Sequence, residues 1–69
     1  MAYNYSKLLD RIIEVCGTQA MFAKEMGLSE RSVSFKLNNK RGWKQKEMKR
    51  ACDVLGFSVS EIPEYFFKE

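Results

Sequence analysis

Apolar residues recur at intervals of three and four along four stretches of the chain, and a glycine follows three of these stretches. Such intervals place apolar side chains on one face of a helix, whereas no stretch alternates apolar and polar residues long enough to indicate a strand. The pattern therefore predicts an all-α fold, with helices over residues 5–16, 19–26, 30–38 and 45–55.

The residues at the ends of these stretches are typical of helix termini. Ser58 and Glu61 have the spacing of a capping box, so one further helical turn is expected before Pro63, followed by an aromatic tail. N-cap residue types precede the first three helices and a glycine follows the first, second and fourth: the caps are Asn4, Thr18 and Ser29, and the glycines are Gly17, Gly27 and Gly56.

Residues 19–37 combine two predicted helices with a short turn, and three residues have the properties that a tight helical corner needs. Ala23 is small where the second helix crosses the first, Gly27 accepts a positive φ in the turn, and Val33 fills the angle between the helices. These features predict a helix-turn-helix unit, whose second helix enters the major groove of DNA in proteins that use it for recognition.

Positive charge is concentrated directly after the turn. The formal net charge of the chain is +3, but residues 36–50 hold seven Lys or Arg residues and only one acidic residue, Glu47. Basic side chains gain affinity for a polyanion by releasing the counterions condensed on its phosphates. The charge pattern alone fits either a nucleic-acid partner or a solvated helix and loop.

The composition argues against an enzyme. A chain of 69 residues with 45% hydrophobic content is expected to form one domain over residues 1–69, with little room for a substrate cavity. It contains no nucleophile with an adjacent base, no clustered metal ligands and no glycine-rich phosphate loop. We therefore expect no catalysis, no metal, no cofactor and no small-molecule ligand.

Two cysteines and the absence of histidine leave too few ligands for a zinc site, so Cys16 and Cys52 are expected to be reduced core residues. The chain also lacks an apolar run approaching the roughly 20 residues that span a bilayer, and it lacks a signal peptide. We expect a cytoplasmic protein without a membrane segment.

Residues from the second helix to the aromatic tail follow the pattern of a known family. They are Gln19-Ala20, Phe22-Ala23, Met26-Gly27-Leu28-Ser29, Lys36-Leu37-Asn38, Trp43 and Glu61-Ile62-Pro63-Glu64-Tyr65-Phe66-Phe67. In these residues the chain resembles the phage Cro proteins and related repressors of the lambdoid type, over nearly its whole length. The resemblance implies a compact, lambda-repressor-like bundle of about five short helices that regulates transcription in a bacterial host as a Cro-like repressor. The chain departs from the family at Lys44, where such domains often place a Ser or Thr cap.

The third helix supplies the candidate contacts to DNA bases. Successive residues of a helix are rotated by about 100°, so Val33 and Leu37 on the inner face leave the opposite face free for recognition. Arg31 is suited to guanine, and Glu30 could accept from cytosine or orient Arg31. The base-contact candidates, which match the reading positions of the resembled family, are Ser29, Glu30, Arg31, Ser34, Phe35 and Asn38.

Phe35 is unusual because an apolar ring on the outer face of a helix needs a cover. Two interpretations stay open: the ring lies on a thymine methyl group, or it packs under the loop around Trp43, which is itself expected in the core. Gln19 could steady Arg31 instead of bonding a phosphate. The candidates for contacts to DNA phosphates are Thr18, Gln19, Lys36, Asn39, Lys40, Arg41 and Lys44.

A domain of this size reads few base pairs, so a homodimer on a two-fold double-stranded operator is the expected form. Tyr65, Phe66 and Phe67 are the candidate dimer contacts, with the alternative that some of these rings fold back onto the first helix. A second class of function also stays open. The same fold could offer Phe35 and the aromatic tail to a protein partner, as an antirepressor does, although the basic loop favours DNA.

Overall fold

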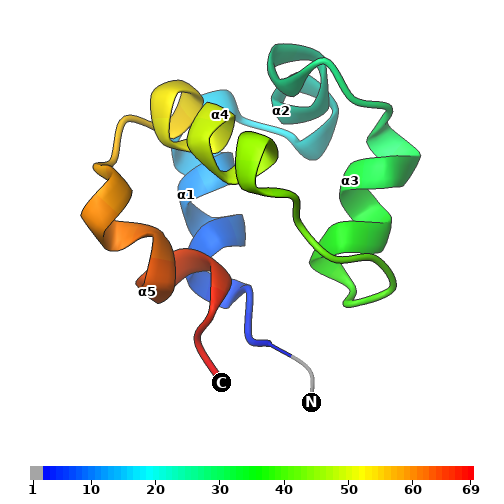
Figure 1. The fold of residues 1–69 in the computed structure, drawn as a ribbon. Coiled ribbons are helices and arrows are strands. Elements are labelled where there is room, and N and C mark those ends of the chain that lie inside the picture. Colours follow the sequence, from blue (N-terminus) through cyan, green and yellow to red (C-terminus); the bar gives the residue numbers. More distant parts are fainter. Residues whose placement is uncertain (1–2) are drawn as a thin grey trace.

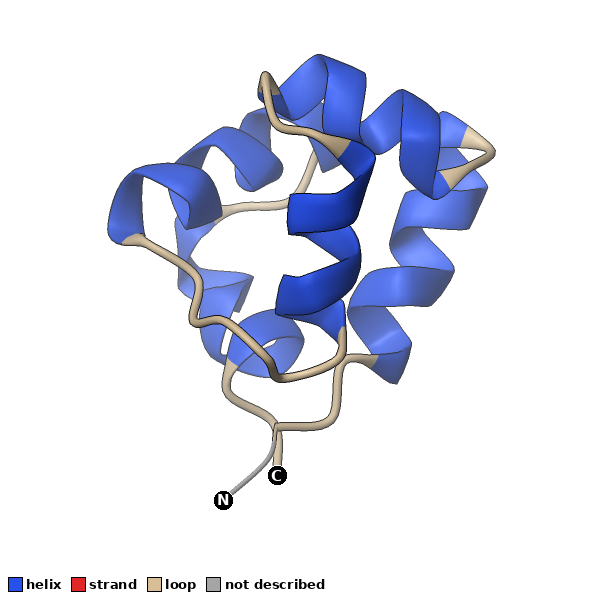
Figure 2. Ribbon diagram, turned by 90° about the vertical axis from the view of Figure 1, so that its right-hand side faces the viewer, coloured by secondary structure: helices blue, strands red, loops and turns tan. Residues whose placement is uncertain are grey.

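A computed structural model describes residues 3–69, and Figure 2 shows helices and loops but no strand in this part of the chain. The predicted all-α bundle is confirmed. None of the described helices is long and apolar enough to cross a membrane. The helices are α1 (Ser6–Cys16), α2 (Gln19–Met26), α3 (Glu30–Leu37), α4 (Gln45–Leu55) and α5 (Ile62–Phe66), with a 3-10 turn η1 (Val59–Glu61) before α5 (Figure 1).

The predicted caps set most of the helix bounds. The hydroxyl groups of Thr18 and Ser29 accept hydrogen bonds from backbone N–H groups in the first turns of α2 and α3. Gly27 ends α2 in the left-handed conformation, with a φ of 73°. Although Lys44 is a poor cap, α4 begins where expected, because the Lys44 backbone N–H donates to Glu47 Oε1 at 2.8 Å.

The chain after Glu61 is helical, where the sequence predicts only an aromatic tail. The Glu61 carboxylate accepts from the Ser58 backbone N–H at 3.0 Å, which confirms the predicted cap and turn. Pro63 does not end the helix, because it lies in the first turn of α5, where a missing N–H has no intrahelical partner to lose.

An aromatic cluster brings α5 onto the core. The Trp43 ring meets Phe66 edge-on with 5.1 Å between centroids, and Phe57 stacks on Tyr65 at 4.1 Å. Tyr65 and Phe66 are 8% and 1% exposed, so the expectation that they contact a second copy is corrected: both rings complete the core. Phe67, at 45% exposed, remains the one candidate of the three for such a contact.

The two termini of the described chain lie side by side in Figures 1 and 2, and the Asn4 backbone N–H donates to the Lys68 carbonyl at 2.6 Å. In Figure 1, α5 lies on one side of the molecule and α3 on the other. At the α2–α3 corner, Ala23 and Val33 are buried as predicted. The outer face of α3 consequently stays open to solvent.

Candidate functional site

The candidate site is the outer face of α3 with the loop that follows it, and we call it the α3 surface. Ser34 and Phe35 are half-buried, while the remaining predicted base-contact residues are exposed. The helical spacing therefore predicted correctly which side of α3 faces outward. The α3 surface consists of Ser29, Glu30, Arg31, Ser34, Phe35, Asn38, Lys40 and Arg41.

Two arginine side chains contact the ring of Phe35. The Arg31 and Arg41 guanidinium carbons lie over its ring at 5.8 and 5.5 Å from the centroid, within the range of cation–π contact. The loop thus covers the ring, as one of the two interpretations requires, but through Arg41. The structure brings together residues ten positions apart in sequence around one aromatic ring.

Both of these guanidinium groups lack a polar partner among residues 3–69. The remaining two arginines donate hydrogen bonds to main-chain carbonyl groups, Arg11 at 3.0 Å and Arg50 at 3.1 Å. Glu30 follows the cap of α3 and is adjacent to Arg31, yet the described ion pairs do not join the two. The N–H groups of Arg31 and Arg41 are therefore available to a partner.

Ser34 and Asn38 interact with each other along the same face. The Asn38 side-chain amide donates to the Ser34 carbonyl at 2.8 Å and lies 3.3 Å from the Ser34 hydroxyl. This one-turn contact fixes the amide at the C-terminal end of α3, where Asn38 is the cap residue. The Asn38 side-chain oxygen has no donor among the described residues and can accept from a partner.

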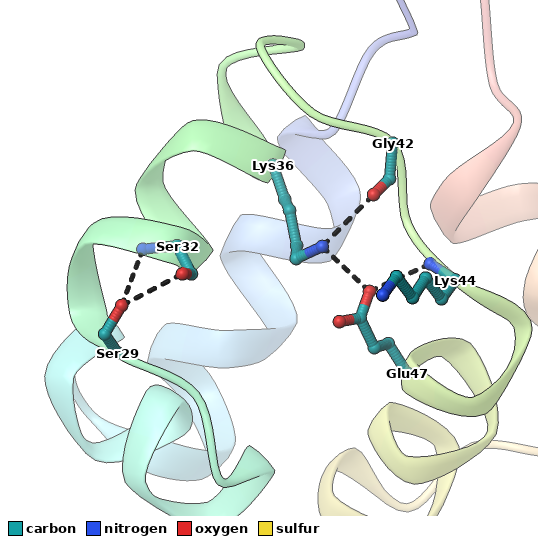
Figure 3. A network of polar contacts seen from close by, with 6 residues as sticks. All are labelled: Ser29, Ser32, Lys36, Gly42, Lys44 and Glu47. Atoms are coloured by element: carbon teal, nitrogen blue, oxygen red, sulfur yellow. Dashed lines mark hydrogen bonds and ion pairs between the residues drawn. The ribbon is translucent and has the colours of Figure 1, made fainter.

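Lys36 is not a phosphate contact, because the structure buries it. Its ammonium lies 2.9 Å from Glu47 Oε1 and donates to the Gly42 carbonyl at 3.1 Å, and the residue is only 5% exposed (Figure 3). Lys36 follows Val33 by three residues, so it lies on the inner flank of α3 and its long stem reaches beneath the loop. The expectation from the sequence is corrected accordingly.

Glu47 joins α3, the loop and α4, a role that sequence reasoning missed. Burial raises the pKa of its carboxyl, but donors from the Lys44 backbone and the Lys36 ammonium outweigh burial and hold the pKa below its usual range. It is the one acidic residue between positions 36 and 50. A single acidic residue among basic ones is the feature of the sequence from which a structural ion pair could have been predicted.

Asn39 is also occupied within the chain. Its side-chain oxygen accepts from the Tyr3 backbone N–H at 2.9 Å, and its amide donates to the Tyr3 carbonyl at 3.0 Å. The backbone is left-handed, with a φ of 61°, a conformation that Asn tolerates better than most residues. The amide thus ties the loop to the N-terminal segment, and because Asn39 is exposed, its contact to a DNA phosphate stays a prediction.

The other predicted phosphate contacts differ in availability. Thr18 uses its hydroxyl as the α2 cap, and Gln19 is half-buried. Lys40, Arg41 and Lys44 are exposed.

An open groove of about 430 Å³ lies between α3 and the loop, and it is lined by Leu28, Ser32, Lys36, Arg41, Gly42, Lys44 and Glu47.

The fold and this surface define a small all-α protein that presents one exposed helix and a basic loop. The chain belongs to the family described as protein of unknown function (DUF739), whose model matches residues 1–69. It is similar to the solution structure of the modulator of repression (MOR) of the temperate bacteriophage TP901-1 from Lactococcus lactis. The identity is 55%, the match covers 97% of this chain and 90% of that chain, and the TM-score is 0.84. No curated protein matches.

Proposed function

We propose that this protein modulates transcriptional repression in a temperate phage by binding a protein partner, the phage repressor. The observation that carries the proposal is the 55% identity to a phage modulator of repression over 97% of the chain. That name describes an effect on repression, which suits a protein that acts on a repressor. The function is one of binding in the bacterial cytoplasm and involves no catalysis.

The α3 surface supports a protein partner. Lys36 and Asn39, which a DNA-binding role assigned to phosphates, are occupied by Glu47 and by the Tyr3 backbone. Phe35 presents a half-buried aromatic ring on the outer face of its helix. Aromatic and arginine side chains are enriched at protein interfaces and supply much of their binding energy.

The proposal is tested with a reporter gene placed under a promoter that the repressor of the same phage controls. We expect co-expression of this chain to raise reporter output when the repressor is present and to leave it unchanged when the repressor is absent. Lys49→Ala, at an exposed position of α4, serves as a control that should act like the wild type. An equal effect without the repressor would contradict the proposal.

A second candidate is a Cro-like repressor that binds a two-fold operator as a dimer, with α3 in the major groove. It is favoured by the exposed N-terminal turn of α3, where Arg31 has no described polar partner, and by the basic residues of segment 36–50. Phe67 is then the candidate dimer contact. On this candidate the chain binds operator DNA without any other protein.

A further inference from the structure

We propose that Arg31 and Arg41, held over the ring of Phe35, receive a carboxylate group on an acidic surface of the protein partner. This inference rests on the proposed function, because it specifies the chemistry of the partner that the α3 surface binds. It assigns Phe35 a positioning role and the two arginines a binding role.

Each guanidinium lies over the Phe35 ring and has no polar partner among residues 3–69, so its N–H groups stay free. The planar fork of a guanidinium matches the two oxygens of a carboxylate. The cation-to-ring distances of 5.8 and 5.5 Å place both groups on the same ring. Because the ring limits their motion, less side-chain entropy is lost when a ligand binds.

The local charge also favours a single anion. Arg31 and Arg41 contact one ring, and the exposed Lys40 precedes Arg41 in the loop, so this part of the surface carries several positive charges. The ring quadrupole offsets part of the repulsion between the guanidinium groups. No described ion pair neutralises any of them. A partner carboxylate would relieve this repulsion and gain charge-assisted hydrogen bonds.

A protein carboxylate fits this surface better than a DNA backbone. Glu30 is exposed in the first turn of the same helix and belongs to none of the described ion pairs. Duplex DNA presents one negative charge about every 1.7 Å along its axis, so it would bring several phosphates toward this carboxylate. A protein can place one acidic group at the arginines and keep acidic groups away from Glu30.

The test measures the dissociation constant of the purified repressor of the same phage for the wild-type chain and for matched variants. Arg31→Ala and Arg41→Ala should each weaken binding by about 10- to 100-fold, the range for a hydrogen bond to a charged group. Arg31→Lys should restore little of the loss, because an ammonium lacks the planar fork. Lys49→Ala removes one charge elsewhere and should change binding by less than about 2-fold.

Phe35 is tested separately because its role is to position the arginines. Phe35→Leu should weaken binding by about 2- to 5-fold. Phe35→Trp should bind the repressor as tightly as the wild type, since Trp gives the strongest cation–π contact. Thermal unfolding followed by circular dichroism confirms that each variant is folded. If Phe35 acted only as an apolar side chain, Leu could replace it. Binding that Leu weakens and Trp retains therefore indicates that the ring positions the arginines.

The outcomes separate this inference from the proposed function. If the repressor binds the wild type and all the arginine variants within about 2-fold, the carboxylate receptor is overturned and the proposed function stands. If the wild type does not bind the repressor, both are overturned. Arginine-dependent binding of the operator duplex by the chain alone would then assign Arg31 and Arg41 to DNA.

Discussion

At the scale of single residues, the Lys36–Glu47 ion pair holds α3 to α4, and its two side chains are only 7% and 15% exposed. Glu47→Gln should destabilise the protein by about 3 to 5 kcal/mol, because it leaves the buried Lys36 ammonium unpaired. Urea unfolding at pH 7 measures the change. The double variant Lys36→Met with Glu47→Leu is the control and should lie near the wild type, since it leaves no buried charge. A loss below about 0.5 kcal/mol for Glu47→Gln, typical of a surface site, would contradict this account.

The same pair makes stability depend on pH in a defined direction. The pKa of Glu47 is lower in the folded protein than its ordinary value of 4.5. The unfolded state therefore takes up a proton first, and the stabilisation is complete above about pH 4.5 and is lost as the pH falls through the folded pKa. The stability difference between wild type and Glu47→Gln should shrink over that acidic range. A difference that stays constant there would exclude the ionised carboxylate as its source.

At the scale of elements, the turn between α2 and α3 sets how α3 is presented. Gly27 has a φ of 73°, and a Cβ added to it would meet no atom within 4 Å. Gly27→Ala should therefore cost about 1 to 2 kcal/mol through backbone strain alone. For a domain of this size, each kcal/mol lowers the melting temperature by about 4 to 8 °C.

Gly42→Ala provides the matched control for Gly27→Ala. A Cβ added to Gly42 would likewise meet no atom within 4 Å, but the φ of Gly42 is outside the left-handed region. The melting temperature of Gly42→Ala should stay at or slightly above that of the wild type, because the substitution reduces the entropy of the unfolded chain. Equal destabilisation by both substitutions would show that the left-handed turn is not the cause.

Local signals in the sequence predicted most of the elements. The bounds of α2 and α4 follow from caps, glycines and apolar spacing, all of which act within a few residues. The helix α5 was missed because Pro63 resembles a terminator, whereas packing of Tyr65 and Phe66 into the core favours helix after it. Such packing involves residues far apart in the sequence, so no local pattern reports it.

Local signals predicted one part of the candidate site and missed another. The outward face of α3 follows from helical periodicity, and Arg31 was identified correctly as exposed. The burial of Lys36 and the occupation of Asn39 depend on Glu47 and Tyr3, which lie 11 and 36 residues away. A lysine or asparagine beside a basic loop is interpreted as solvent-exposed unless such a distant partner is known.

At the scale of the whole molecule, the packing of α5 leaves the α3 surface free. Tyr65 and Phe66 are held in the core, and α5 and α3 lie on different sides of the molecule in Figure 1. The basic segment 36–50, by contrast, reaches the C-terminal part of the chain, because the Trp43 ring contacts Phe66. The helical part of the α3 surface lies away from α5, whereas its loop residue Arg41 lines a groove with Tyr3 and Phe67, next to both ends of the described chain.

The most direct test of the central claim is a gel-shift measurement on the operator of the same phage, with the repressor alone, this chain alone and both together. We predict that the chain alone leaves the duplex unshifted and that increasing amounts of it reduce the repressor–operator complex. The Arg31→Ala variant should require about 10- to 100-fold higher concentration than the wild type to reduce the repressor–operator complex equally. A duplex shifted by the chain alone, with the repressor complex unaffected by its addition, would contradict the proposed function and favour a Cro-like repressor.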